Sequence, residues 1–194
     1  CYAYRSAWRM SRISSPTTNR HWQIFRLSTM SHIYHHSEAI TLESGAVLKE
    51  VDIVYDTYGK INAQRDNIIW VCHALTANSD AQDWWPELVG PGKLFDTEKY
   101  FVVCANMLGS PYGSSGPSQT DPQTGRPYFL DFPKITVRDI VKANDLVREH
   151  LGIEKIDFMV GGSIGGFQSI EWSIMKPEVI EKAVYIACGA RVTP

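Results

Sequence analysis

The sequence predicts an α/β domain in which helices flank a mostly parallel central sheet. The main support is the order of elements over residues 136–188, where two helix patterns alternate with two strand patterns. Such a succession builds a parallel sheet through right-handed crossovers. Two earlier apolar runs, residues 68–74 and 101–107, are rich in β-branched and aromatic residues, which suits central strands covered on both faces.

Composition and charge favour one soluble domain that acts on small molecules. The chain has 194 residues, of which 44% are hydrophobic and 21% charged, so it can bury a core. A net charge of -2 gives it no general attraction to nucleic acid or to an anionic membrane. No apolar run reaches the roughly 18 residues that a membrane-spanning helix needs. We therefore expect neither nucleic acid nor a membrane as partner.

The four cysteines indicate a reducing compartment. Cys72, Cys104 and Cys188 each lie inside an apolar run, and Cys1 begins the chain. None belongs to a CxxC pair, so buried thiols are expected in place of a disulfide framework or a zinc site. These features favour a cytoplasmic protein without a bound metal.

Residues 1–29 differ from everything after them. They contain five arginines, five serines and no acidic residue. This composition is typical of an organellar transit peptide. The alternative is upstream sequence read through into the frame, with Met30 as the true start, and we favour it because strand-like alternation begins only after Met30. In both cases the domain is expected over residues 30–194.

The strands and helices follow in order. Residues 51–56 alternate in polarity and predict a strand with one face more buried than the other, followed by a turn around Gly59 and Lys60. We also expect an early antiparallel hairpin in this part of the chain. A helix is predicted over residues 136–152, with Thr136 as N-cap and Gly152 as the C-terminal stop. Its apolar face consists of Val137, Ile140, Val141, Val147 and Leu151. A strand over 157–161, a helix over 165–176 and a strand over 182–188 complete the pattern.

The pentapeptide at residues 161–165 reads GxSxG and carries the chemistry. A nucleophilic serine must project from a sharp turn between a strand and a helix, and Gly161 and Gly165 would remove side chains that clash in that turn. Since a strand pattern enters the motif and a helix pattern leaves it, we predict that Ser163 is the nucleophile of an α/β-hydrolase fold. The alternative is a phosphate-binding or purely structural glycine turn.

An oxyanion hole is predicted from two backbone N–H groups. Ile164, which follows the nucleophile, would supply one, and Leu75, which follows the strand at 68–74, would supply the other. His73 lies close by, but it precedes the serine, whereas the fold runs serine, acid, histidine. We therefore interpret His73 as a structural residue.

The triad aspartate and histidine are not expected in this chain. Only 31 residues follow Ser163 and none of them is histidine, while His150 falls at the end of a helix and four other histidines, at positions 21, 32, 35 and 36, lie near the amino terminus. A serine hydroxyl is a poor nucleophile without a positioned base. We expect a truncated α/β-hydrolase domain that lacks its C-terminal part and lid and is inactive alone.

Four segments together resemble the homoserine O-acetyltransferase family of α/β-hydrolase-fold enzymes. They are HALTANSD, NMLGSPYGSSGPSQTDPQTGRPY, DFPKITVRDIVKA and GGSIGGFQSIEW. The resemblance implies transfer of an acetyl group from acetyl-CoA, as co-substrate, to the hydroxyl of L-homoserine, a step toward methionine. It implies an acyl-enzyme on Ser163, oxyanion donors at Leu75 and Ile164, no bound cofactor and a homodimer.

Some features depart from the family pattern. Its aspartate, its histidine, a substrate-binding arginine and most of its helical lid lie in sequence that is absent here. Ile164 replaces the usual methionine, and Pro111 removes one backbone donor near the site. Three alternatives stay open: an acyltransferase with another donor or acceptor, such as succinyl-CoA or serine, an esterase, and a non-catalytic binding module. Trp84 and Trp85 could line a substrate entrance, although packing is the expected role of such side chains.

Overall fold

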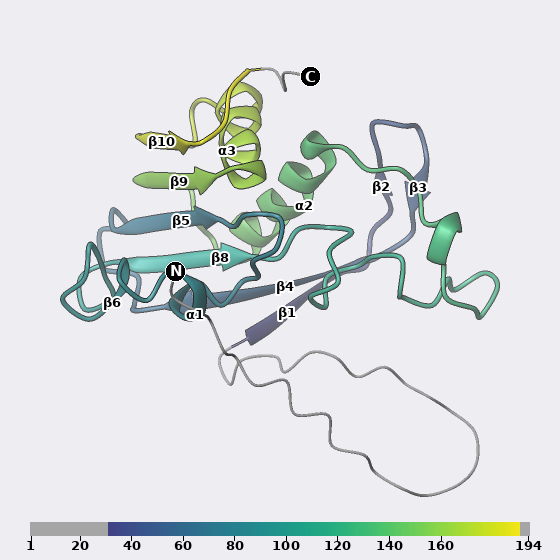
Figure 1. The fold of residues 1–194 in the computed structure, drawn as a ribbon, viewed down its shortest axis with the longest axis horizontal. Coiled ribbons are helices and arrows are strands. Elements are labelled where there is room, and N and C mark those ends of the chain that lie inside the picture. The colour runs from purple at the N-terminus through teal and green to yellow at the C-terminus, as the bar shows by residue number, and fades with distance from the viewer. Residues whose placement is uncertain (1–30, 191–194) are drawn as a thin grey trace, which may run out of the picture.

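The computed structural model describes residues 31–190 and has one six-stranded sheet with helices beside it (Figure 1). In spatial order its strands are β1 (Ser31–His36), β4 (Val51–Tyr58), β8 (Phe101–Ala105), β5 (Ile68–Cys72), β9 (Phe158–Gly162) and β10 (Ala183–Ile186). Two small sheets pair β2 (Ile40–Thr41) with β3 (Val47–Leu48), and β6 (Val89–Gly90) with β7 (Phe95–Asp96). The helices are α1 (Ala81–Trp84), the 3-10 helix η1 (Phe129–Asp131), α2 (Val137–His150) and α3 (Ile164–Met175). The predicted leader, residues 1–29 with Cys1, lies outside the described residues.

The sheet is mostly parallel, as predicted. Strand β5 pairs in parallel with β8 on one side and β9 on the other, and β9 pairs in parallel with β10. Strand β4 is antiparallel to both β1 and β8. Over residues 51–56 one face is more buried than the other, as predicted, because Val51, Ile53 and Tyr55 are all buried whereas Asp52 on the opposite face is half-buried. The rest of that opposite face is buried too. The strand lies inside the sheet, between β1 and β8, and both of its faces are covered.

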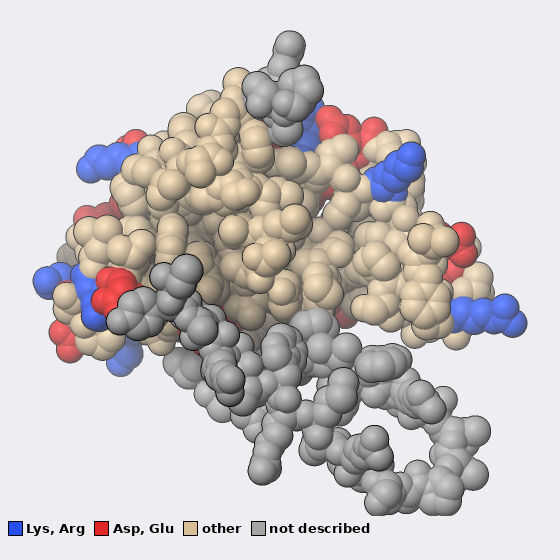
Figure 2. Space-filling view, in the orientation of Figure 1, with Lys and Arg blue, Asp and Glu red and all other residues tan. Residues whose placement is uncertain are grey.

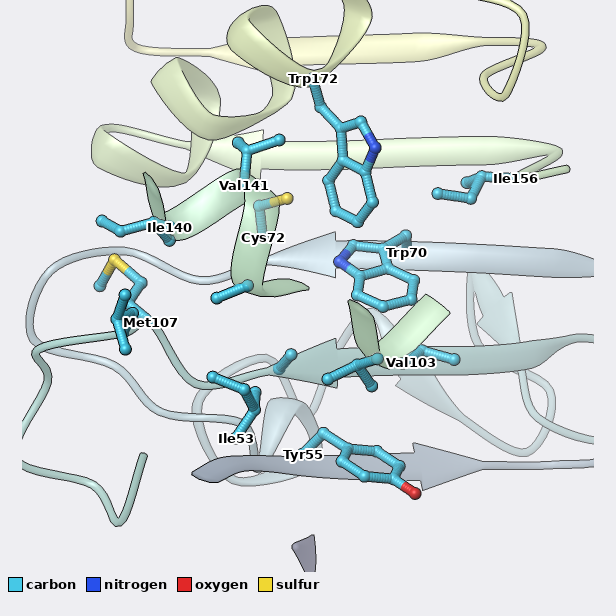
Figure 3. Close-up of a cluster of buried hydrophobic side chains, with 14 of the residues drawn as sticks. Ile53, Tyr55, Trp70, Cys72, Val103, Met107, Ile140, Val141, Ile156 and Trp172 are labelled. Atoms are coloured by element: carbon cyan, nitrogen blue, oxygen red, sulfur yellow. The ribbon is translucent and has the colours of Figure 1, made fainter. Parts of the chain in front are cut away.

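Two apolar clusters cover the two faces of the sheet. Alternate residues of β5 face opposite ways, so Trp70 packs beneath α2 and α3, whereas Val71 packs against the segment that contains α1 and β7. Figure 3 shows Trp172 pointing from α3 onto Trp70, and the two rings meet edge to face with centroids 5.0 Å apart. Every residue of β5 and β8 is buried, as predicted for these central strands.

The two long helices begin where the sequence indicates. Thr136 caps α2 with a reciprocal capping box, because its hydroxyl accepts from the Asp139 N–H while the Asp139 carboxylate accepts from the Thr136 N–H. Helix α3 follows β9 directly through Ser163. Among residues 31–190, no helix is long and apolar enough to cross a membrane.

The cysteine prediction is correct at two positions and wrong at one. Cys72 and Cys104 are buried free thiols inside β5 and β8, but Cys188 is half-buried and lies beyond the end of β10. Strand β10 is shorter than the predicted 182–188 and forms an edge of the sheet, with the large side chains of Val184, Tyr185 and Ile186 exposed. An edge strand has a neighbour on one side only, which explains both observations.

Candidate active site

Ser163 occupies the sharp junction between β9 and α3. Its φ of 56° and ψ of -124° lie outside the regions that L-residues favour, and such strain costs about 1–3 kcal/mol. The Ser163 N–H donates to the Ile186 carbonyl of β10 over 2.9 Å, and its carbonyl accepts from the Gly166 and Phe167 N–H groups at 2.9 and 3.2 Å. The surrounding strands and helix thus hold the strained turn and leave the serine exposed.

Glycines flank the serine because backbone or a side chain occupies the space of a Cβ. A Cβ on Gly161 would overlap the Gly165 carbonyl and lie 2.6 Å from Ser169 Oγ. A Cβ on Gly165 would overlap the Cys72 carbonyl oxygen, and a Cβ on Gly166 would lie 2.8 Å from the Cβ of Cys188. By contrast, nothing lies within 4 Å of a Cβ on Gly162. The sequence pattern identified Gly161 and Gly165 as required glycines but did not identify Gly166. The only sign in the sequence was that Gly166 directly follows another glycine.

Leu75 and Ile164 lie on the wall of one pocket at the carboxyl ends of the parallel strands. Its volume is about 320 Å³, near the lower end of the roughly 300–1,000 Å³ of small-molecule sites. Gly165 fits against the Cys72 and His73 carbonyls, so the turn at Ser163 touches the loop after β5 directly. The apolar lining includes Leu75, Met107, Leu108, Pro111, Ile140 and Ile164.

Neither the Leu75 N–H nor the Ile164 N–H has a hydrogen-bond partner within residues 31–190. Ile164 is the first residue of α3, where N–H groups find no acceptor inside the helix and the helix dipole favours negative charge. Unoccupied donors at one pocket are what a developing oxyanion requires. The pairing of these two donors around one oxygen stays a prediction.

The loop after β8 forms the opposite side of the pocket and is held by buried hydrogen bonds. Asn106 accepts from the Ser79 N–H at 2.8 Å and donates to the Tyr112 carbonyl at 2.9 Å. Ser114 Oγ accepts from the Val54 N–H at 3.0 Å and donates to the Asn106 carbonyl at 3.1 Å. In Figure 2 the charged side chains lie toward the rim of the visible face, and its middle is uncharged.

His73 is fully buried, and its position argues against a role as the catalytic base, as expected from the sequence. Its side chain is fully buried, and desolvation lowers its pKa to about 4, so the ring is neutral at pH 7. One ring nitrogen contacts the Ala74 carbonyl at 2.8 Å, and the other lies 3.2 Å from the Met107 N–H. With both nitrogens occupied, the ring has no free site for a proton from Ser163.

No acid–base partner of Ser163 occurs in the described part of the chain. His150 stacks on Tyr34, with ring centroids 4.4 Å apart, and His35 contacts Asp52 at 2.7 Å. No group of three or more histidine, cysteine, aspartate or glutamate side chains between residues 31 and 190 could hold a metal ion.

Trp84 and Trp85 are half-buried and pack against the core, which agrees with the expected packing role. Both rest on the apolar cluster behind β5, and their rings lie 4.8 Å apart. The indole N–H of Trp84 donates to the Asn78 carbonyl at 2.8 Å.

Comparison with known proteins places the chain among related sequences and structures. The family model of the alpha/beta hydrolase fold matches residues 67–189. A curated homoserine O-acetyltransferase of Cyclobacterium marinum is 47% identical over 162 residues, which cover 84% of this chain and 46% of the relative. The crystal structure of homoserine O-acetyltransferase from Bacillus anthracis aligns with a TM-score of 0.73 and 31% identity, covering 79% of this chain and 45% of the other. An acetylester hydrolase from Corynebacterium glutamicum aligns with a TM-score of 0.75 and 28% identity, covering 84% and 46%. This chain thus spans about half the length of the relatives it matches.

Proposed function

This chain belongs to the alpha/beta hydrolase fold family, and from that membership we propose that Ser163 is the nucleophile of an acyltransferase. The enzyme moves an acetyl group from acetyl-CoA to the hydroxyl of L-homoserine, a step toward methionine. The observation that carries this proposal is the strained Ser163 between β9 and α3, in a chain 47% identical to a homoserine O-acetyltransferase.

The reaction proceeds in two displacements on the same serine. Ser163 Oγ attacks the thioester carbonyl carbon while a base takes its proton, and the carbonyl electron pair moves onto oxygen. The N–H groups of Leu75 and Ile164 stabilise that oxyanion. Collapse breaks the C–S bond, and the CoA thiolate leaves and takes up the proton. The homoserine hydroxyl then gives its proton to the base and attacks the carbonyl carbon of the acetyl-serine. The bond from that carbon to Ser163 Oγ breaks, Oγ takes the proton from the base, and O-acetylhomoserine leaves.

The remaining parts of the enzyme belong to the same proposal. The base and the acid that orients it come from sequence outside residues 31–190, because the histidines of this part have other partners. That sequence also supplies the lid that keeps water from the acetyl-serine. Residues 30–194 then form the amino-terminal part of the domain, preceded by a leader. The resemblance supports a cytoplasmic homodimer with acetyl-CoA as substrate and no bound cofactor.

Hydrolysis of acetyl esters is the second candidate function. It is favoured by the structural similarity to an acetylester hydrolase, which matches that to homoserine O-acetyltransferase. The two reactions share the acetyl-serine and differ in the group that attacks it, water or homoserine. Both reactions would use the Leu75 and Ile164 donors that line the pocket of about 320 Å³.

The test uses the protein made from the complete gene. Acetyl-CoA is supplied with and without L-homoserine, and free thiol is followed over time. The proposal expects thiol release that requires homoserine and is lost in Ser163→Ala. Ser173→Ala is the matched control, because it makes the same change further along α3 and should leave the rate unaltered.

Each other outcome has a definite meaning. Thiol release that does not need homoserine would identify a hydrolase. Release from succinyl-CoA in place of acetyl-CoA, or with serine as acceptor, would correct the substrates. Activity that survives in Ser163→Ala would reject the nucleophile.

A further inference from the structure

His73 connects the two loops that form the pocket. Its fully buried ring stands at the end of β5, between the loop that contains Leu75 and the loop that begins at Met107. An imidazole in an apolar core costs free energy unless both of its nitrogens are hydrogen-bonded. An apolar side chain such as methionine would fill the same space without that cost. The presence of a polar ring here is therefore better explained by a role in the site.

The partners of the ring determine its tautomer. Ala74 presents a carbonyl oxygen, which can only accept, so the Nδ1 atom of His73 must carry the proton and donate at 2.8 Å. Met107 presents an N–H, which can only donate, so Nε2 must be bare and accept at 3.2 Å. A charged ring would place a second proton against the Met107 N–H.

The Ala74 carbonyl belongs to the same peptide unit as the Leu75 N–H. This peptide is trans, since no cis peptide bond occurs in residues 31–190, so the carbonyl and the N–H point in opposite directions within one plane. The carbonyl receives two donors, Nδ1 of His73 and the Ala77 N–H at 3.0 Å. Holding the carbonyl prevents the peptide plane from rotating, which fixes the direction of the N–H. Donation to the carbonyl also makes the N–H a stronger donor.

We propose that His73 is a positioning residue that aims the Leu75 N–H into the oxyanion hole. This inference rests on the proposed role of Ser163 and Leu75 in acyl transfer. In this role His73 acts on the peptide group between Ala74 and Leu75 and does not contact the substrate. The turn at Ser163, between β9 and α3, lies close to the Leu75 loop, because Gly165 fits directly against the Cys72 and His73 carbonyls. This contact brings the Leu75 N–H toward the serine.

Two substitutions separate the two bonds of the ring. In His73→Asn the side-chain amide reaches roughly as far as Nδ1, so it can still donate to the Ala74 carbonyl but cannot reach Met107. In His73→Gln the amide reaches roughly as far as Nε2, so its oxygen can accept from the Met107 N–H while the bond to Ala74 is lost. Both variants keep a polar amide in the core.

The assay follows p-nitrophenyl acetate cleavage by the complete protein, with Ser163→Ala as the inactive control. An ester is used because an oxyanion forms in hydrolysis as well as in transfer, so the result does not depend on the identity of the acceptor. Loss of one oxyanion donor costs about 10²–10³ in kcat. We expect His73→Gln to lower kcat by about 10² with KM changed less than about threefold, and His73→Asn to stay within about tenfold of wild type.

A merely structural role gives a different pattern. Both variants would then lose kcat in proportion to their loss of thermal stability, with His73→Asn no better than His73→Gln, and this result would overturn the proposal. Full kcat in a folded His73→Gln protein would also overturn it. Failure of the wild-type protein to release thiol from acetyl-CoA in the presence of homoserine would instead reject the proposed function.

Nuclear magnetic resonance of the wild-type ring gives a test without activity. Long-range proton–nitrogen correlations of His73 should show one neutral tautomer with its proton on Nδ1 at pH 7. A proton on Nε2 alone would exclude donation to the Ala74 carbonyl, and a charged ring would exclude acceptance from the Met107 N–H. Either result would reject the proposal even if the variants do not fold.

Discussion

Replacing Gly165 by alanine tests whether the elbow depends on direct backbone contact. The added Cβ would overlap the Cys72 carbonyl oxygen and lie 2.8 Å from the His73 carbonyl oxygen. Because favourable contacts between carbon atoms lie at about 3.5–4.0 Å, the first turn of α3 must retreat by roughly 1 Å. Both neighbours are backbone, so no rotamer change can relieve the clash.

The magnitude follows from two opposing effects. Overpacking costs about 1–3 kcal/mol, and sometimes more, while alanine in a helix regains about 1 kcal/mol over glycine. A clash with backbone falls at the upper end, so we expect a net loss of about 2 kcal/mol for Gly165→Ala. In a protein of 150–250 residues this lowers Tm by about 4–8 °C. A 1 Å displacement at a reacting group also costs about 10² in rate.

Gly162→Ala is the matched control. It makes the same change three positions earlier, where nothing lies within 4 Å of the new Cβ, so the free energy of unfolding should stay within about 0.5 kcal/mol of wild type. Thermal and urea unfolding give the stabilities, and p-nitrophenyl acetate cleavage by the complete protein gives the rate.

Equal free energies of unfolding for Gly165→Ala and Gly162→Ala would refute the close approach of α3 to the loop after β5.

Three further outcomes can be measured by urea unfolding. Ser163→Gly should abolish ester cleavage yet raise stability by about 1 kcal/mol, because relief of about 1–3 kcal/mol of strain exceeds the conformational cost of glycine; a loss of stability would contradict the strain at φ 56°. Burial lowers the pKa of His73 from 6.5 to about 4, so between these pH values the unfolded chain binds a proton that the folded chain does not. The free energy of unfolding should therefore fall by about 3 kcal/mol as the pH drops from about 6.5 to about 4. His73→Asn should flatten that fall, and an unchanged pH profile would reject the assignment. Thr136→Ala should cost about 1 kcal/mol through loss of the capping box, and a cost below about 0.3 kcal/mol would mean that the cap contributes little.

Local patterns predicted the parts of the fold that depend on neighbours in sequence. The elbow around Ser163 and the cap at Thr136 each involve a few consecutive residues, and both have the expected form. Fully apolar runs predicted β5 and β8 correctly, because a strand covered on both faces needs no polar alternation.

Long-range pairing explains what the sequence did not reveal. Strand β8 follows β5 in the chain but inserts between β4 and β5, a pairing of distant segments that no local pattern marks. The half-exposure of Cys188 follows from the edge position of β10, which no local signal marks. Likewise, chain order argued against His73 as the catalytic base, but its bond to Met107 joins loops that are distant in sequence and could not be predicted.

The hydrogen bond from Ser163 to Ile186 also has a consequence for synthesis on the ribosome. The turn at Ser163 is held by a hydrogen bond to β10, which is translated after the serine itself. At roughly 5–20 residues per second, the supporting strand emerges on the order of seconds after the serine. During that interval the nascent chain contains the nucleophile but lacks one of the bonds that hold its strained backbone. The backbone geometry of Ser163 is therefore completed only after β10 has been translated.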